Sequence, residues 1–153
     1  MTRTVLVIPV PELEPAAQIA LLDPFAGLDE ISDGMLAELR AVFADVTAFP
    51  FKLAAIRESA GTAYLSPEPR DPFRHLSQEL VRRFPEYPPQ RSLPGDVVAQ
   101  LNLPEAPMDR QRRRLALERR LPILAYANAA ELWWYGPGGR RTLERFPFGT
   151  TAA

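Results

Sequence analysis

The sequence predicts a mixed α+β fold in which most neighbouring strands are antiparallel. Short β-branched or alternating apolar segments, typical of strands, are interspersed with segments in which apolar residues recur at helical spacing. The predicted order is strand, strand, helix, hairpin, helix, strand, helix and hairpin, so several strands directly follow one another along the chain. A length of 153 residues fits one domain. We therefore expect residues 1–153 to form a single α+β domain.

The N-terminal part of the chain begins with a β-branched run and contains one amphipathic helix. Ser32 is suited to cap that helix, and the apolar residues that follow it fall on one face. A polar segment that ends in Gly61 separates two short apolar segments, which indicates a hairpin. The predicted elements are strands at 5–10 and 18–25, a helix at 33–44, and hairpin strands at 49–56 and 62–65.

The C-terminal part contains two predicted helices. Asp71-Pro72 supplies an N-cap and a proline for the first turn of one of them, and Phe73, Leu76 and Leu80 lie on its apolar stripe. The second helix is rich in arginine. The predicted elements are a helix at 72–84, a strand at 96–103, a helix at 108–120, and strands at 123–135 and 141–148 joined by a glycine-rich turn.

The composition excludes several kinds of chemistry. The chain has no cysteine and one histidine, so it lacks the ligands for thiolate or multi-histidine metal sites and the groups for two-imidazole catalysis. We expect no metal and no cofactor. No apolar segment approaches the ~20 residues that a membrane helix needs, and residues 1–10 do not resemble a signal peptide. These features favour a cytoplasmic protein with no membrane contact.

One short pattern occurs twice, 82 residues apart. Gln18-Ile19-Ala20-Leu21 and Gln100-Leu101-Asn102-Leu103 share the order glutamine, aliphatic, small or polar residue, leucine. Residues i and i+2 of a strand face the same side. We therefore expect Gln18 with Ala20, and Gln100 with Asn102, to face one side, and the aliphatic residues to face the other.

These two segments resemble the signatures of the 2H phosphoesterase superfamily, in particular its bacterial 2′-5′ RNA ligase-like proteins. The first family signature reads His, aliphatic, Thr, Leu, Leu, Tyr, Pro, Phe, where this chain has residues 18–25. The second is another His, aliphatic, Thr after Val-Val, where this chain has residues 96–103. Segments 64–69, 72–89 and 131–149 also resemble the family's middle strand, second helix and last hairpin, so the resemblance covers nearly the whole chain.

The resemblance implies two pseudo-symmetric lobes of mainly antiparallel sheet, flanked by helices, around a central cleft. In the family one histidine of each motif acts as general base or general acid on a phosphodiester, and the threonines hold the phosphate. Here Gln18 and Gln100 stand where those histidines are expected. An amide does not transfer protons near neutral pH, and each such transfer contributes roughly 10² to 10⁴-fold to the rate. His75 is predicted on a solvated helix face. We therefore expect no phosphodiesterase or RNA ligase activity.

Three hypotheses for the function of the cleft remain open. In the first, it binds a small molecule or partner through Gln18, Gln100, Asn102 and Tyr64. In the second, it is a repurposed enzyme site for a non-phosphate substrate, of isomerase, cyclase or lyase type. Its candidate catalytic residues are Asp23 and Tyr64, although strand alternation predicts that Asp23 faces away from Gln18. In a third, the cleft is a filled polar seam without a ligand.

The charges are unevenly distributed along the chain. Residues 1–50 carry a formal charge of −6 and the remainder +5. The arginines of the third predicted helix spread over most of its circumference, so we expect a solvated helix that pairs with the acidic N-terminal third rather than a nucleic-acid surface; an RNA-binding remnant is the alternative. They are Arg110, Arg112, Arg113, Arg114, Arg119 and Arg120.

Overall fold

The computed structural model describes residues 2–59, 61–87, 98–101 and 103–149. It is an α+β fold, as predicted, and its helices lie within one or two residues of the expected ones. In chain order the elements are β1 (Arg3–Pro9), β2 (Gln18–Leu22), the 3₁₀ helix η1 (Leu28–Glu30), α1 (Asp33–Ala44), β3 (Phe49–Ser59), β4 (Thr62–Glu68), α2 (Asp71–Arg83), β5 (Ala99–Gln100), α3 (Pro107–Glu118), β6 (Ile123–Ala127), β7 (Ala129–Gly136) and β8 (Gly139–Pro147).

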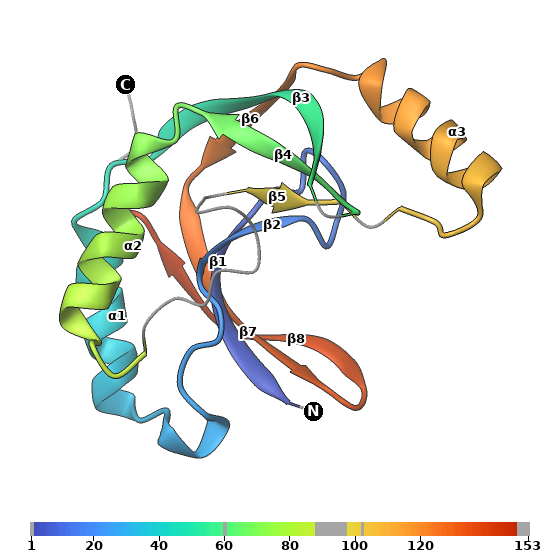
Figure 1. The fold of residues 1–153 in the computed structure, drawn as a ribbon. Coiled ribbons are helices and arrows are strands. Elements are labelled where there is room, and N and C mark those ends of the chain that lie inside the picture. Colours follow the sequence, from blue (N-terminus) through green and yellow to red (C-terminus); the bar gives the residue numbers. More distant parts are fainter. Residues whose placement is uncertain (1, 60, 88–97, 102, 150–153) are drawn as a thin grey trace.

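The strands form a strongly bent sheet in the order β6-β3-β4-β5-β2-β1-β7-β8, and each described pairing is antiparallel (Figure 1). The β2–β5 pairing joins two halves of four strands each. One half is β6-β3-β4-β5 and the other is β2-β1-β7-β8. This agrees with the two-lobed arrangement that the family resemblance implies.

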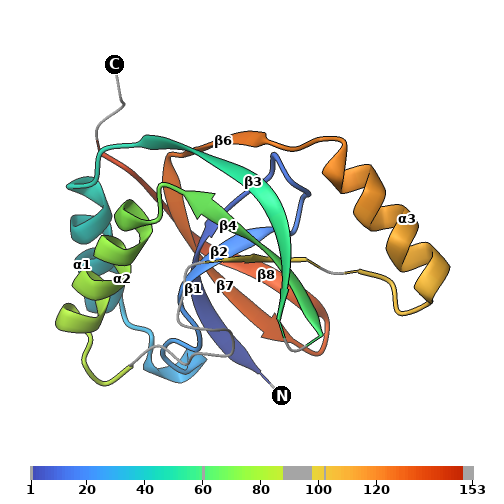
Figure 2. The ribbon, with the colours of Figure 1, turned by 45° about the horizontal axis from the view of Figure 1, so that its top comes forward.

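Helices α1 and α2 lie side by side and cover one face of the sheet (Figures 1 and 2). The Ser32 hydroxyl accepts a hydrogen bond from the backbone N–H of Met35 at 3.2 Å, which caps α1 as predicted. Phe43 of α1 and Phe73 of α2 are fully buried. They pack in one aromatic group with rings from β3 and the C-terminal strand, namely Phe49, Phe51, Phe146 and Phe148.

The structure corrects the expected strand at 123–135. The chain forms two strands there, β6 and β7, interrupted at Asn128. Strand β6 pairs with β3 in one half of the sheet, whereas β7 pairs with β1 in the other, so the chain crosses between the halves at this residue. The expected strand at 96–103 is described only as β5, Ala99–Gln100; residues 96, 97 and 102 lie outside the described residues.

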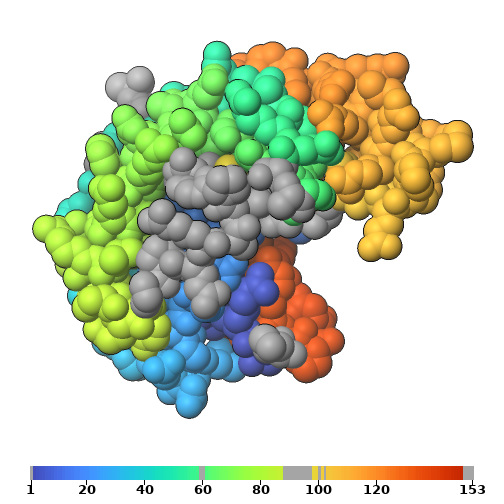
Figure 3. Space-filling view, viewed as in Figure 1, coloured from blue at the N-terminus to red at the C-terminus, as the bar shows by residue number. Residues whose placement is uncertain are grey.

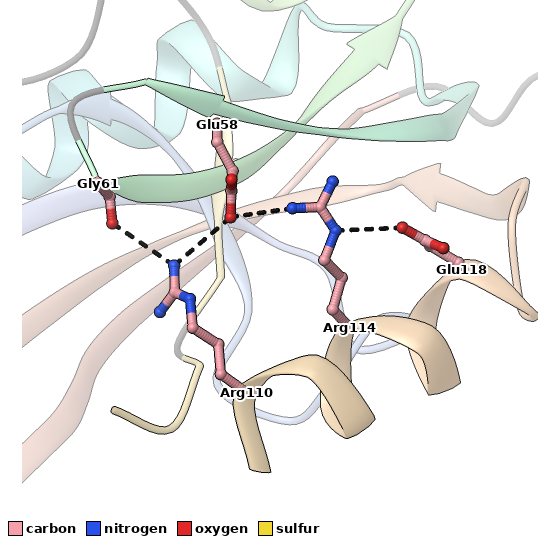
Figure 4. Close-up of polar contacts among 5 residues, drawn as sticks. All are labelled: Glu58, Gly61, Arg110, Arg114 and Glu118. Carbon is pink, nitrogen blue, oxygen red and sulfur yellow. Dashed lines mark hydrogen bonds and ion pairs between the residues drawn. The ribbon is translucent and has the colours of Figure 1, made fainter. Parts of the chain in front are cut away.

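Helix α3 lies at the opposite end of the molecule from α1 and α2 (Figures 1 and 2). Leu117 is its only buried residue. Arg110 and Arg114 bridge to Glu58 of β3, at 3.6 and 2.9 Å, and Arg110 also donates to the Gly61 carbonyl (Figure 4). This helix is therefore attached to the body of the protein largely through charged side chains.

In the space-filling view, α3 and the β7–β8 hairpin project on the same side of the molecule, with a notch between them (Figure 3). None of the described helices is long and apolar enough to cross a membrane.

Candidate functional site

Four polar residues lie in register across four adjacent strands. Arg57 of β3 pairs with Tyr64 of β4, and Tyr64 pairs with Gln100 of β5. The partner of Ile19 on β2 is Ala99 on β5. Since the strands are antiparallel, the preceding residue, Gln18, stands opposite Gln100. We refer to Arg57, Tyr64, Gln100 and Gln18 as the polar row.

Arg57, Tyr64 and Gln18, the members of the polar row whose side chains the structure describes, lie on the sheet face turned away from the main core. Ile19, Leu65 and Ala99, which neighbour row members along the strands, are fully buried in that core. Gln18 is partly exposed, as is Ala20, the other residue that alternation places on its side. The predicted orientation of the first glutamine motif is thus confirmed. In the second motif Leu101 is buried as expected, and Asn102 lies outside the described residues.

Gln18 carries an unusual polar atom. Its Oε1 is buried and has no hydrogen-bond partner among the described residues, although the side chain as a whole is partly exposed. A buried polar atom without a partner costs roughly 1–3 kcal/mol, so such atoms are rare. Within the described part of the chain, this oxygen therefore has unused capacity to accept a hydrogen bond.

A hollow of about 430 Å³ adjoins the row on the β3–β4 side. It is lined by Arg57 and Tyr64 of the row, by the Ser66 hydroxyl and by Val98, among others. Pockets for small organic ligands have volumes of roughly 300–1,000 Å³. The hollow is thus large enough for a small molecule, and polar side chains from two adjacent strands line it.

Arg57 is the residue of this site that sequence reasoning missed. In the sequence it belongs to the polar segment before Gly61, which looks like an ordinary hairpin turn. In the structure β3 extends to Ser59, so Arg57 belongs to the strand and pairs with Tyr64. The sequence gives no sign of where β3 ends, because the last residues of the strand and the residues of the turn are equally polar.

On the other half of the sheet the same face is filled by side chains. Trp133 of β7 is 1% exposed and packs against Val5 and Val7 of β1. The Arg140 guanidinium stacks on its indole ring at 4.0 Å. Its neighbour Trp134 lies on the opposite side of β7 and is partly exposed.

Glu131 connects Trp133 of β7 with Arg145 of β8 on this face. Its Oε1 accepts a hydrogen bond from the Trp133 indole N–H at 2.7 Å, and its Oε2 pairs with Arg145 at 2.9 Å. Glu131 is opposite Val7, which is opposite Ala20 on β2. A carboxylate that sequence reasoning did not select therefore shares a face with Gln18.

Asp23 is not oriented as strand alternation predicts. The β1–β2 register shifts between Leu6 and Val7, so that Leu22 faces the core and Asp23 turns to the face of the polar row. There its Oδ1 pairs with Arg3 at 3.0 Å, and the Arg3 guanidinium lies over the Tyr135 ring at 4.8 Å. Burial raises the pKa of Tyr135, an effect that the positive charge of Arg3 opposes. Asp23 is thus paired with Arg3 just after the end of β2. This position is about 16 Å along the strand from Gln18.

The remaining residues considered from the sequence lie away from the row. His75 is exposed on α2, as predicted. Arg113 of α3 pairs with Glu14 at 2.7 Å, which agrees with the expected pairing to the acidic N-terminal third, but Arg110 and Arg114 pair with Glu58 instead. In the described parts of the chain no three His, Asp or Glu residues are grouped so as to hold a metal ion.

The bent antiparallel sheet with its two halves of four strands defines a two-lobed α+β protein. The sequence profile of the 2′-5′ RNA ligase superfamily matches residues 16–138, which is more than half of the chain. The protein therefore belongs to the 2′-5′ RNA ligase superfamily. A search of curated proteins finds no significant match.

Solved structures of similar fold include E. coli LigT and a phosphoesterase. LigT complexed with 3′-AMP aligns with a TM-score of 0.61 at 12% identity, covering 96% of this chain and 98% of LigT. LigT complexed with ATP gives 0.57 at 12% identity, covering 96% and 97%. The phosphoesterase gives 0.59 at 12% identity, covering 96% and 98%. At these identities the likeness concerns the fold.

Proposed function

We propose that this protein has lost the phosphodiesterase and RNA ligase chemistry of its family and binds a small molecule in the cleft over the polar row. The observation that carries the proposal is the Gln18 amide, which stands opposite Gln100 at the junction of the two halves and has a buried, unpaired oxygen. These are the two positions where the family resemblance leads us to expect histidines.

The loss of chemistry follows from the properties of the amide group. Glutamine donates and accepts hydrogen bonds but neither takes up nor releases a proton near neutral pH. Replacing a general base and a general acid removes roughly 10² to 10⁴-fold each. The single histidine, His75, is exposed on α2 and is not a member of the row.

The binding function is supported by the hollow next to the row. Its volume of about 430 Å³ and its lining by Arg57, Tyr64 and Ser66 suit a small polar ligand. LigT has been crystallised with 3′-AMP, with ATP and with NADP+. We infer that the cleft of this protein has kept the capacity to bind a small molecule.

Two measurements test the proposal together. Native mass spectrometry of protein taken from an extract of its own cells should detect a bound small molecule, which should be absent from Gln18→Leu protein. The purified protein should leave 2′,3′-cyclic AMP intact. Hydrolysis of this nucleotide that is unaffected in Gln18→Ala and Gln100→Ala would contradict our account of the site.

The second candidate function is a repurposed enzyme for a non-phosphate substrate. It is favoured by Tyr64, a member of the row, and by Glu131, a carboxylate held on the same face by Trp133 and Arg145. Incubation of a cell extract with the protein, followed by metabolite profiling, should then reveal an isomerised, cyclised or dehydrated compound. Its formation should stop in Tyr64→Phe or Glu131→Gln protein, and no such compound is expected if the cleft only binds.

A further inference from the structure

We propose that Arg57 is the anchor for one negative charge, so that the cleft takes a small monoanion of carboxylate type that also carries a hydrogen-bond donor. This inference rests on the proposed binding function and names the ligand class for the same cleft. It follows from the charges along the hollow, from the groups beside Arg57 and from the unpaired atom of Gln18.

Arg57 is a cation at the hollow for which the described residues provide no carboxylate partner. Glu68, which also lines the hollow, forms an ion pair with Lys52 at 3.7 Å. Arg70, another lining residue, already takes part in an interaction, so the proposed anchor is Arg57 alone. Within the described parts of the chain, no carboxylate pairs with Arg57, which is exposed on β3. A ligand with a single negative charge balances this guanidinium.

The groups beside Arg57 suit a carboxylate. A guanidinium presents its N–H donors as a planar fork that matches the two oxygens of a carboxylate. Tyr64 is opposite Arg57 in the ladder, and Ser66 follows two residues later on the same face of β4, so both hydroxyls line the same hollow. They add neutral donors, which strengthen anion binding without adding charge.

At the opposite end of the row, the ligand should provide a hydrogen-bond donor. The buried Oε1 of Gln18 is an acceptor that has no partner in the described part of the chain. Adjacent strands lie about 4.8 Å apart, so the backbones of Arg57 and Gln18 are separated by about 14 Å across three spacings. A molecule with the carboxylate at one end and an N–H or O–H group at the other satisfies both residues.

The surroundings disfavour a dianion such as a phosphate monoester. The Glu68 carboxylate lines the hollow, and its exposed ion pair with Lys52 offsets its charge only in part, so it disfavours a second negative charge on the ligand. The two central positions are neutral amides rather than cationic imidazoles. Beyond Gln18 the row continues to Pro9, and the adjoining face is occupied by Val7 and Trp133. The cations of that half already have partners, because Arg140 stacks on the Trp133 ring and Arg145 pairs with Glu131.

The test is calorimetric titration with three probes. 4-Aminohippurate carries one carboxylate and an amine donor, its primary carboxamide is the neutral analogue, and phenyl phosphate is the dianion. The Arg57→Gln variant should weaken binding of 4-aminohippurate about tenfold, since a hydrogen bond to a charged group is lost, and leave the carboxamide unaffected. Arg112→Gln is the matched control, because Arg112 is exposed on α3 and lines no part of the hollow.

Each outcome separates this inference from the proposed function. Equal weakening by Arg57→Gln and Arg112→Gln, no weakening by Arg57→Gln, or tighter binding of phenyl phosphate than of 4-aminohippurate would overturn the assignment to a monoanion. If the carboxamide still binds and Gln18→Leu abolishes its binding, the small-molecule function stands without the charge assignment. If neither 4-aminohippurate nor its carboxamide binds, this inference fails, and the function then depends on the ligand search described above.

Discussion

Gln18 on β2 and Gln100 on β5 stand opposite each other in the antiparallel ladder, as the pairing of Ile19 with Ala99 requires. The two residues are 82 positions apart in the sequence, yet they meet at the junction of the two halves of the sheet. The short sequence echo is therefore also a symmetric pair in space. Positions 18 and 100 are therefore neighbours at the junction of the two halves.

Replacing Gln18 with leucine should separate stability from binding. The buried, unpaired Oε1 disappears and an apolar side chain takes its place, so we expect the free energy of unfolding to stay the same or to rise by about 1 kcal/mol. Urea denaturation measures this change. Gln78→Leu, at an exposed position on α2, is the control and should show no gain. A loss of stability of several kcal/mol in Gln18→Leu would mean that the amide has a structural partner.

Replacing Glu58 with glutamine should loosen α3. Arg110 and Arg114 then lose their shared carboxylate, while Leu117 alone remains buried (Figure 4). Both ion pairs are partly exposed, so global stability should fall by no more than about 1 kcal/mol. Hydrogen exchange of the α3 amides should nevertheless become several-fold faster.

The matched control for Glu58→Gln is Glu144→Gln. Glu144 forms a comparable exposed pair with Arg40 at 3.0 Å, between α1 and β8. This change should leave exchange in α3 unaltered. Raising the salt concentration of the wild-type protein should reproduce the effect of Glu58→Gln, because added ions screen exposed pairs. Unchanged exchange under both conditions would show that α3 does not depend on these charges.

Truncating Trp133 to alanine should be strongly destabilising. The indole is 1% exposed, packs on Val5 and Val7, and donates to Glu131. Removing a buried aromatic side chain costs about 3–5 kcal/mol. Trp134→Ala, on the partly exposed side of β7, should cost clearly less, and urea denaturation of both variants measures the difference. Equal costs would contradict the packing described for Trp133.

Glu79 should make stability depend on acid pH. Hydrogen bonds from Arg82 and Arg83 hold the pKa of its carboxyl below the ordinary value of 4.5. A group whose pKa is lowered by folding contributes stability above its unfolded pKa and loses it as the pH falls through the folded pKa. Wild-type protein should therefore be more stable than Glu79→Gln near pH 6, and this difference should shrink as the pH falls below 4.5. A difference in urea denaturation that stays constant as the pH is lowered through the acid range would contradict this.

Much of the fold could be predicted because its signals are local. Ser32 caps α1, and Pro72 lies in the first turn of α2 as expected, although the N-cap of α2 is Arg70 and not the predicted Asp71, which is already the first residue of the helix. Apolar spacing marks the buried faces of both helices. Alternation correctly placed Gln18 and Ala20 opposite to Ile19. Such patterns depend only on residues a few positions apart, so predictions made from them do not depend on how distant segments pack.

The predictions for Asp23 and for a single strand at 123–135 were wrong because pairing with strands distant in the sequence interrupts the local pattern there. The register shift between β1 and β2 reverses alternation before Asp23, and the change of partners from β3 to β1 breaks the strand at Asn128. The side chains of Asp23 and Asn128 do not indicate these changes, because the neighbouring strands determine where a bulge or a crossover occurs.

By itself, the sequence determined the class of fold, the helices and the family resemblance, and it led us to expect glutamines at the two positions of the family's histidines. Only the tertiary structure decided that Arg57, Tyr64, Gln100 and Gln18 form one row, and that Trp133 fills the opposite half. The reason is that side-chain type and spacing are properties of short segments, whereas strand order and register emerge from burying all segments in one core.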